Sequence, residues 1–231
     1  MASLGALAVL AIIGRLGFVL LVEGAATSRQ RRGHRRRLLL VGQRDAGTGA
    51  LVVPHATPAV YCLAGRRGLV VCTSAAMAAL DVHEFRAVLA HERAHLHRRH
   101  DVALMAAAVL HAAFPFIPAF TVARAELARL VEMQADDAAA VGADRRVLAM
   151  ALVRLAEGAI PVGALAASGT TALERVRRLS GPANPLSRIS SSLTAFAAFT
   201  AVMLPLLIAV GPGVVAAVLH YCPLGFPPPR L

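Results

Sequence analysis

Residues 80–96 read LDVHEFRAVLAHERAHL, a stretch with the pattern of a capped amphipathic helix. Asp81 stands where an N-cap is expected, and Glu84 follows three residues later, as in a capping box. Apolar residues recur along the stretch at helical spacing: Val82, Phe85, Val88, Leu89 and Leu96. We therefore expect a helix with one apolar side and one polar side.

Two histidines of this helix are placed to share one metal ion. His91 and His95 are four residues apart, so their imidazoles lie on the same helix face. Two neutral imidazoles suit zinc. Glu92 projects about 100° away from His91, because an α-helix has 3.6 residues per turn. It can therefore act as a general base on water at the metal without being a ligand. The pattern predicts one catalytic Zn²⁺ per chain.

A catalytic zinc site needs a third protein ligand besides its open position. The acidic stretch 126–137 offers Glu132 and Asp136, which are four residues apart and share a helix face. We expect Glu132 to be the ligand and Asp136 to accept the second ring N–H of a ligating histidine. Glu126, on a different face, is the competing ligand, and Asp137 is expected to be solvated.

These residues also have a simpler interpretation as a solvated polar face, because arginines and histidines crowd residues 91–100. The five-residue pattern alone occurs in unrelated proteins. Arg175, Arg177 and Arg178 offer stabilisation of an oxyanion, although solvent or phospholipid is their expected environment. No role is expected for the other histidines considered: His34, His55, His83, His97, His100 and His111.

The composition indicates a membrane protein with a polar portion. Of the 231 residues, 57% are hydrophobic and 16% are charged, which excludes a disordered chain, a coiled coil and a typical soluble enzyme. Three stretches are apolar enough to meet a bilayer: 3–22, 102–123 and 193–219.

Arginines set the expected topology. Six of them lie between residues 29 and 37, whereas the tail after the third apolar stretch holds one. The positive-inside rule then predicts transmembrane helices at 1–23 and 191–220, a cytosolic domain at 24–190 and an extracytoplasmic tail at 221–231. A cleaved signal peptide is the alternative for the first stretch, but no arginine precedes it. Beside a span, the arginine run is expected to contact anionic lipid rather than nucleic acid.

The middle apolar stretch must return to the side on which it began. His95 precedes it and Glu132 follows it, so a single crossing would separate these two residues by the bilayer. Pro115 and Pro118 interrupt the stretch, and proline disrupts a helix interior. We predict a re-entrant or membrane-dipping helical hairpin at 102–123.

Upstream of the helix, residues 59–74 read AVYCLAGRRGLVVCTS, in which two short apolar runs are split by a Gly-Arg-Arg-Gly turn signal. This segment, the histidine helix and Glu132-x-x-x-Asp136 together resemble the membrane-bound zinc peptidases of the BlaR/MecR antirepressor type. They resemble heat-shock-type membrane metallopeptidases more distantly. The resemblance covers about residues 30–180. It implies a mainly α, integral-membrane gluzincin body with a small β-hairpin or sheet, flanked by transmembrane helices.

The resemblance also implies roles for particular residues. It makes His91, His95 and Glu132 the zinc ligands and Glu92 the base, and it places Asp136 behind them. It further implies that a strand with Tyr61, Cys62 and Leu63 borders the cleft, where an extended substrate could add to its edge. A plain structural ribbon is the alternative for this strand.

The predicted function is that of a membrane-embedded zinc endopeptidase in the inner or plasma membrane, multi-pass, with its catalytic domain in the cytosol. By resemblance, its substrate is a winged-helix repressor or a membrane protein, and its role is regulatory proteolysis. Quality control of membrane proteins and a non-catalytic adaptor with a degenerate metal site are alternatives; the intact Glu92 argues against the adaptor. An arginine-driven nucleic-acid binder would show steep salt dependence without metal. Direct beta-lactam acylation is excluded, because the chain has no lysine for a Ser-x-x-Lys motif.

Overall fold

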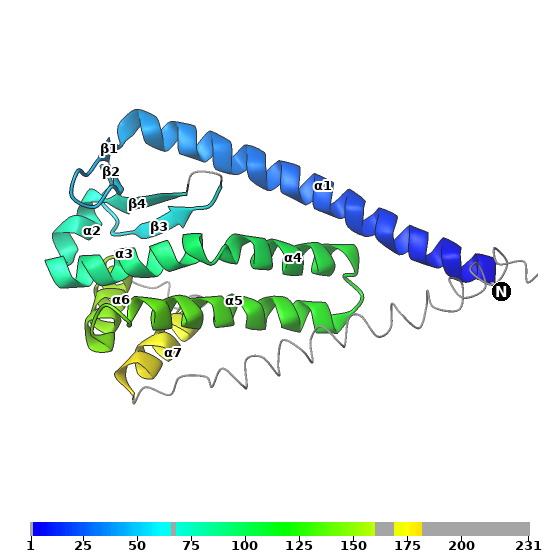
Figure 1. Cartoon of the computed structure of the whole chain (residues 1–231). Helices are drawn as coiled ribbons and strands as arrows, with labels where there is room; N and C mark the ends of the chain where they lie inside the picture. Colours follow the sequence, from blue (N-terminus) through cyan, green and yellow to red (C-terminus); the bar gives the residue numbers. More distant parts are fainter. Residues whose placement is uncertain (1, 66–67, 160–168, 182–231) are drawn as a thin grey trace, which may run out of the picture. The chain divides into compact units, whose positions relative to one another are not determined.

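The computed structural model describes residues 2–65, 68–159 and 169–181 (Figure 1). These residues are mainly helical and include one small sheet, which confirms that part of the predicted fold class. The elements are α1 Ala2–Val41, β1 Gln43–Arg44, β2 Leu51–Val53, β3 Val60–Leu63, β4 Leu69–Thr73, α2 Ser74–Ala79, α3 Val82–His97, α4 His100–Ala113, α5 Pro118–Ala139, α6 Arg145–Ala159 and α7 Gly169–Ser180.

The chain divides into two units. One consists of residues 1–18 and 185–231, of which the structure describes only the start of α1. The other is Val19–Asn184, which contains the sheet and the remaining helices. The predicted second span at 191–220 and the tail at 221–231 lie outside the described residues.

Among the described residues, one helix is long and apolar enough to cross a membrane, namely Leu7–Val41 of α1. Large apolar side chains near its start are more than half exposed, including Leu7, Leu10 and Phe18. The predicted first span, 1–23, falls largely within this helix. A single such helix near the N-terminus gives weak support to membrane association, and the multi-pass arrangement stays a prediction.

The sheet has the strand order β1-β2-β4-β3. β3 and β4 form an antiparallel hairpin in which Cys62 is opposite Val70, while β2 runs parallel to β4. Leu38 of α1 belongs to the apolar cluster on one side of the sheet, and Leu89 of α3 belongs to the cluster on the other. Because β3 pairs only with β4 among the described strands, its second edge is free of sheet partners.

Helix α3 begins with the expected capping box. The Asp81 carboxylate accepts hydrogen bonds from the backbone N–H groups of His83 (2.8 Å) and Glu84 (2.9 Å), and the Glu84 carboxylate accepts one from Asp81 N–H (3.0 Å). The buried side of the helix carries Val88 and Leu89, which are 3% and 1% exposed. The start of α3 is therefore set by contacts between neighbouring residues, Asp81 and Glu84, and packing against other elements then orients the helix.

Helices α4 and α5 form a hairpin and pack side by side (Figure 1). Helix α4 ends at Ala113, residues 114–117 turn the chain, and Pro118 occupies the first position of α5, where its missing N–H has no helical partner to lose. The chain therefore reverses near the two prolines and brings α5 back to pack against α3. Entry of this hairpin into a bilayer stays a prediction.

Helix α6 packs against α3, and α7 packs against α6 and α5. Leu148 of α6 and Leu179 of α7 join Val88 of α3 in one buried cluster. Helix α7 is also tied to α5 by ion pairs, with Arg178 on Asp137 (2.6 Å) and Arg129 on Glu174. This packing brings side chains of α7 to the polar side of α3.

Candidate metal centre

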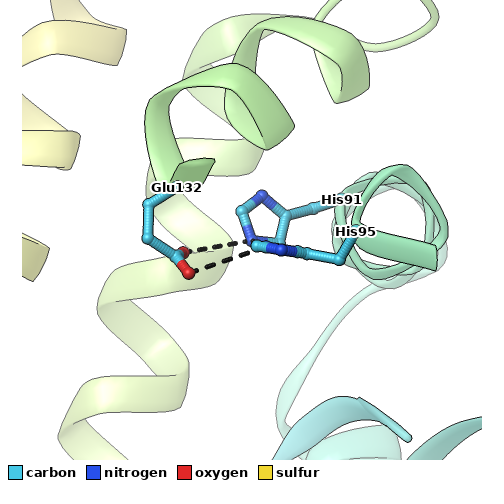
Figure 2. A group of neighbouring side chains, drawn as sticks. All are labelled: His91, His95 and Glu132. Atoms are coloured by element: carbon cyan, nitrogen blue, oxygen red, sulfur yellow. Dashed lines mark hydrogen bonds and ion pairs between the residues drawn. The ribbon is translucent and has the colours of Figure 1, made fainter. Parts of the chain in front are cut away.

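The three predicted ligands converge at the junction of α3 and α5. Figure 2 shows His91 and His95 on one helix and Glu132 reaching toward them from another. The Glu132 carboxylate oxygens lie 3.4 Å from Nε2 of His91 and 3.6 Å from Nε2 of His95. The two Nε2 atoms are 3.1 Å apart. One ligand atom from each residue lies within 4.8 Å of the others, and this is a group of metal-binding type in the part of the chain that the structure describes.

These separations fit a tetrahedral ion. Zinc ligands at roughly 2.0–2.1 Å from the metal in a tetrahedron lie about 3.3–3.4 Å from one another. The observed 3.1, 3.4 and 3.6 Å bracket that value. The donor set of two imidazoles and one carboxylate is one that catalytic zinc uses. The residues present therefore fit the metal, while their role as ligands stays a prediction.

The environment of the histidines differs between the two rings. His91 is 5% exposed; burial opposes its charged form, but hydrogen bonds to Asp136 and Glu132 outweigh burial and raise its pKa to about 9. For His95, burial lowers the pKa to about 4; His91 and Arg175 add to this effect, and Glu132 opposes it. Burial acts to raise the pKa of Glu132, but His91 and Arg175 outweigh burial, so the pKa lies below its ordinary value. The negative Glu132 thus faces the two rings.

Asp136 supports the first histidine from behind. Its carboxylate is fully buried, and Oδ1 lies 3.0 Å from Nδ1 of His91. Since Nδ1 is held there, Nε2 of His91 is the nitrogen turned toward Glu132. Burial acts to raise the pKa of Asp136, but hydrogen bonds from His91 and Arg175 bring it below its ordinary value. The geometry places Asp136 next to a predicted ligand, and its role in holding that ligand stays a prediction.

Arg175 of α7 lies in the centre, contrary to its expected place in solvent or phospholipid. Its guanidinium donates to both Asp136 oxygens, at 2.9 and 2.7 Å, and lies 3.0 Å from Glu132. The side chain is 14% exposed, because α7 packs against the end of α5 that carries these carboxylates. Arg178 is also largely buried rather than solvated, because it forms an ion pair with Asp137. Asp137, expected to be solvated, is thus held in that ion pair. Arg177 is exposed.

Glu92 lies at the cavity beside the ligands but is not one of the converging group. Burial raises the pKa of its carboxyl, which strengthens it as a proton acceptor, and the Cys62 thiol lies within hydrogen-bonding reach. The competing ligand Glu126 is not brought to the centre: it lies on α5 beside Arg129, at 3.4 Å, and its side chain is 56% exposed.

His100 is a residue of the centre that sequence reasoning missed. It is 4% exposed, and its Nδ1 lies 2.9 Å from Nδ1 of His95. Its Nε2 lies 2.8 Å from Oε1 of Gln134. Helical spacing could not reveal the contact, because the helix is broken at Arg99, whose φ of 54° is left-handed. The signal in the sequence was only a further histidine shortly after the motif.

A cavity of about 370 Å³ opens beside these residues, and Tyr61 and Cys62 of β3 line it. Leu63 lines an adjoining cavity of about 380 Å³, which also includes Cys62, His95 and His100. The three predicted cleft residues of β3 therefore line these two cavities, both of which also include His95.

A His-Glu-x-x-His helix completed by a glutamate from a second helix is an arrangement that zinc metallopeptidases use. Comparison with protein families agrees: residues 45–125 match the model of peptidase family M48. The match includes His91, Glu92 and His95 and ends before Glu132. It supports the M48 metallopeptidase family, whose members depend on a metal that is typically zinc, and does not separate out the BlaR/MecR type. No curated protein and no solved structure matches the chain.

Proposed function

We propose that this chain is a zinc endopeptidase of the inner or plasma membrane whose active site faces the cytosol. The observation that carries the proposal is the approach of His91, His95 and Glu132 at tetrahedral ligand separations beside an open cavity. The M48 match supports the reaction class. Helix α1, with its apolar start and its arginines at residues 29–37, supports the membrane location and the orientation.

His91, His95 and Glu132 would hold the zinc. The chemistry that bound zinc supplies is Lewis-acid polarisation of a carbonyl and of water. Glu92 accepts the proton of the attacking water, a role that its raised pKa favours, and then donates it to the leaving amine. Asp136 holds the ring of His91, and Arg175 compensates the charges of Asp136 and Glu132.

We propose regulatory proteolysis as the physiological role, with a cytosolic repressor or a membrane protein as substrate. The support is the resemblance of residues 59–74, of the histidine helix and of Glu132-x-x-x-Asp136 to the BlaR/MecR type. A gene for a small winged-helix repressor beside this one would favour that role. Cleavage restricted to misfolded membrane proteins would favour quality control instead.

The test is metal content and peptide cleavage by the full chain purified in detergent. Glu92→Gln should retain zinc and lose cleavage by roughly 10²–10⁴-fold, because it removes only the proton acceptor. His95→Ala should lose the zinc itself. The matched control is His97→Ala, an exposed histidine on the same helix, which should behave as wild type.

Equal cleavage by wild type and Glu92→Gln would contradict the peptidase mechanism. Full zinc content in His95→Ala would contradict the ligand set. These two outcomes are independent, so the metal site and the reaction are tested separately.

A further inference from the structure

A cavity lined by arginines lies where β3 ends. Its volume is about 710 Å³, and Arg31, Arg32 and Arg35 of α1 line it together with residues 63–65. Its lining among the described residues contains no acidic side chain. A guanidinium carries a permanent charge and five N–H donors in a planar fork that matches a carboxylate. The cavity is therefore suited to an anionic ligand.

Three contacts hold this part of α1 against the body of the protein. Arg31 pairs with Asp101 of α4 at 3.1 Å, and Nε2 of His34 lies 3.1 Å from the hydroxyl oxygen of Tyr61 on β3. Leu38 is buried in the apolar cluster of the sheet. The arginines among these residues are thus positioned before any ligand arrives, which lowers the entropic cost of binding.

The arginines of α1 lie on two different faces of the helix. Arg31 and Arg35 are half-buried, and at helical spacing they share a face with the buried Leu38. Arg36 and Arg37 are exposed and do not line the cavity. Contact with anionic lipid requires no arginine turned toward the protein, so the arginines on the inner face call for a ligand held between α1 and the sheet.

Shared lining residues connect the arginine cavity to the metal centre. The cavity of about 380 Å³ has Arg31, Leu63 and Ala64 in common with it. That cavity shares Cys62 and His95 with the cavity of about 370 Å³ at the predicted ligands. From Cys62 to residue 65 the chain advances at most about 10 Å, at roughly 3.3 Å per residue. An extended peptide at the metal centre therefore reaches the arginines about three residues from the scissile bond.

We propose that the arginine cavity is a subsite for acidic peptide, so that the enzyme favours substrates with Asp or Glu about three residues from the scissile bond, on one side of it. This proposal rests on the proposed peptidase function and adds a substrate class to it. One exposed ion pair changes affinity by up to about fivefold, so two together give up to about 25-fold. The gain should appear in KM rather than in kcat, because the arginines are remote from Glu92.

The first experiment is cleavage of a proteome-derived peptide library by the zinc-loaded full chain in neutral detergent, with cut sites read by mass spectrometry. Wild type should show Asp and Glu enriched by about fivefold or more around the third residue on one side of the cut. Arg32→Gln/Arg35→Gln should abolish this enrichment. Arg36→Gln/Arg37→Gln is the matched control, because it removes the same charge from exposed positions of the same helix and should keep the enrichment.

The second experiment measures binding without cleavage. The probe is a fluorescein-labelled tetraglutamate peptide, and its affinity for the full chain is read by fluorescence anisotropy. Arg32→Gln/Arg35→Gln should weaken binding at least about fivefold more than the control does. In 1 M salt the difference should shrink, because the Debye length falls from about 10 Å at 0.1 M to about 3 Å.

The outcomes separate the subsite from the reaction. Wild type that cleaves no peptide contradicts the peptidase function, whereas anisotropy still reports on the anion site. Cleavage without acidic enrichment, or equal loss in the two double variants, overturns the subsite and leaves the peptidase function standing. Binding of phosphatidylglycerol that is lost only in Arg32→Gln/Arg35→Gln, without acidic enrichment, overturns it in favour of a lipid headgroup. If that double variant does not fold, Arg32→Gln, an exposed single change, decides by the same measurements.

Discussion

At the scale of single residues, the orientation of His95 depends on a relay from α4 and α5. The carboxamide oxygen of Gln134 only accepts, so Nε2 of His100 donates to it at 2.8 Å and Nδ1 of His100 is left as an acceptor. Nδ1–H of His95 then donates to that nitrogen at 2.9 Å. The Nε2 lone pair of His95 is thereby turned toward Glu132, as a metal ligand requires.

We predict that His100→Ala weakens zinc binding by about 10- to 100-fold, because His95 loses the partner that sets its tautomer and ring position. The measurement is competition for zinc with a chelator of known affinity, using the purified full chain. His83→Ala, an exposed change on α3, is the control. An affinity equal to that of wild type would show that His100 does not position the ligand.

At the scale of elements, α7 completes the centre that α3 and α5 build. Asp136 of α5 is fully buried and carries a negative charge whose cationic partner, Arg175, comes from α7. A buried charge without a partner is strongly unfavourable. The packing of α7 is therefore coupled to the negative charge of Asp136, which also holds the ring of His91.

We predict that Arg175→Met lowers the free energy of unfolding by about 3 kcal/mol, since the buried Asp136 carboxylate loses its guanidinium partner and keeps only His91. Chemical denaturation in detergent measures this. Arg177→Met, on the exposed side of the same helix, should leave the stability within about 0.5 kcal/mol of wild type. Equal losses in the two variants would show that the ion pair with Asp136 does not stabilise the protein.

At the scale of the whole molecule, the chain reversal between α4 and α5 decides whether a metal site can form. The turn exposes Phe116, 74% accessible, and Val122 near it is 61% accessible. Apolar side chains exposed at the tip of a hairpin are suited to a membrane surface. The predicted re-entrant hairpin accounts for them while keeping His95 and Glu132 on one side.

We predict that topology reporters fused after Asp101 and after Glu126 both report the cytosol, because the hairpin between them returns to its starting side. Paired reporters that are active on opposite sides of the membrane give the measurement. A reporter fused after Arg37 is the control for the cytosolic side. Opposite locations for the first two fusions would contradict the hairpin.

What the sequence determined by itself is local. His91 and His95 share a helix face, and so do Glu132 and Asp136, because residues i and i+4 are neighbours on a helix. The cap of α3 follows from the identities of Asp81 and Glu84, and the turn before α5 from Pro115 and Pro118. The mainly helical fold with a small sheet follows from similar patterns.

The tertiary structure decided which distant side chains complete the centre. Arg175 enters it because α7 packs on α5, and His100 because a left-handed Arg99 turns the chain between two helices. The cavity beside the centre likewise depends on α6 lying beside α3, because Leu148, Leu152 and Leu155 of α6 line it. Contacts between elements depend on packing and on turn geometry, and neither leaves a periodic signal in the sequence.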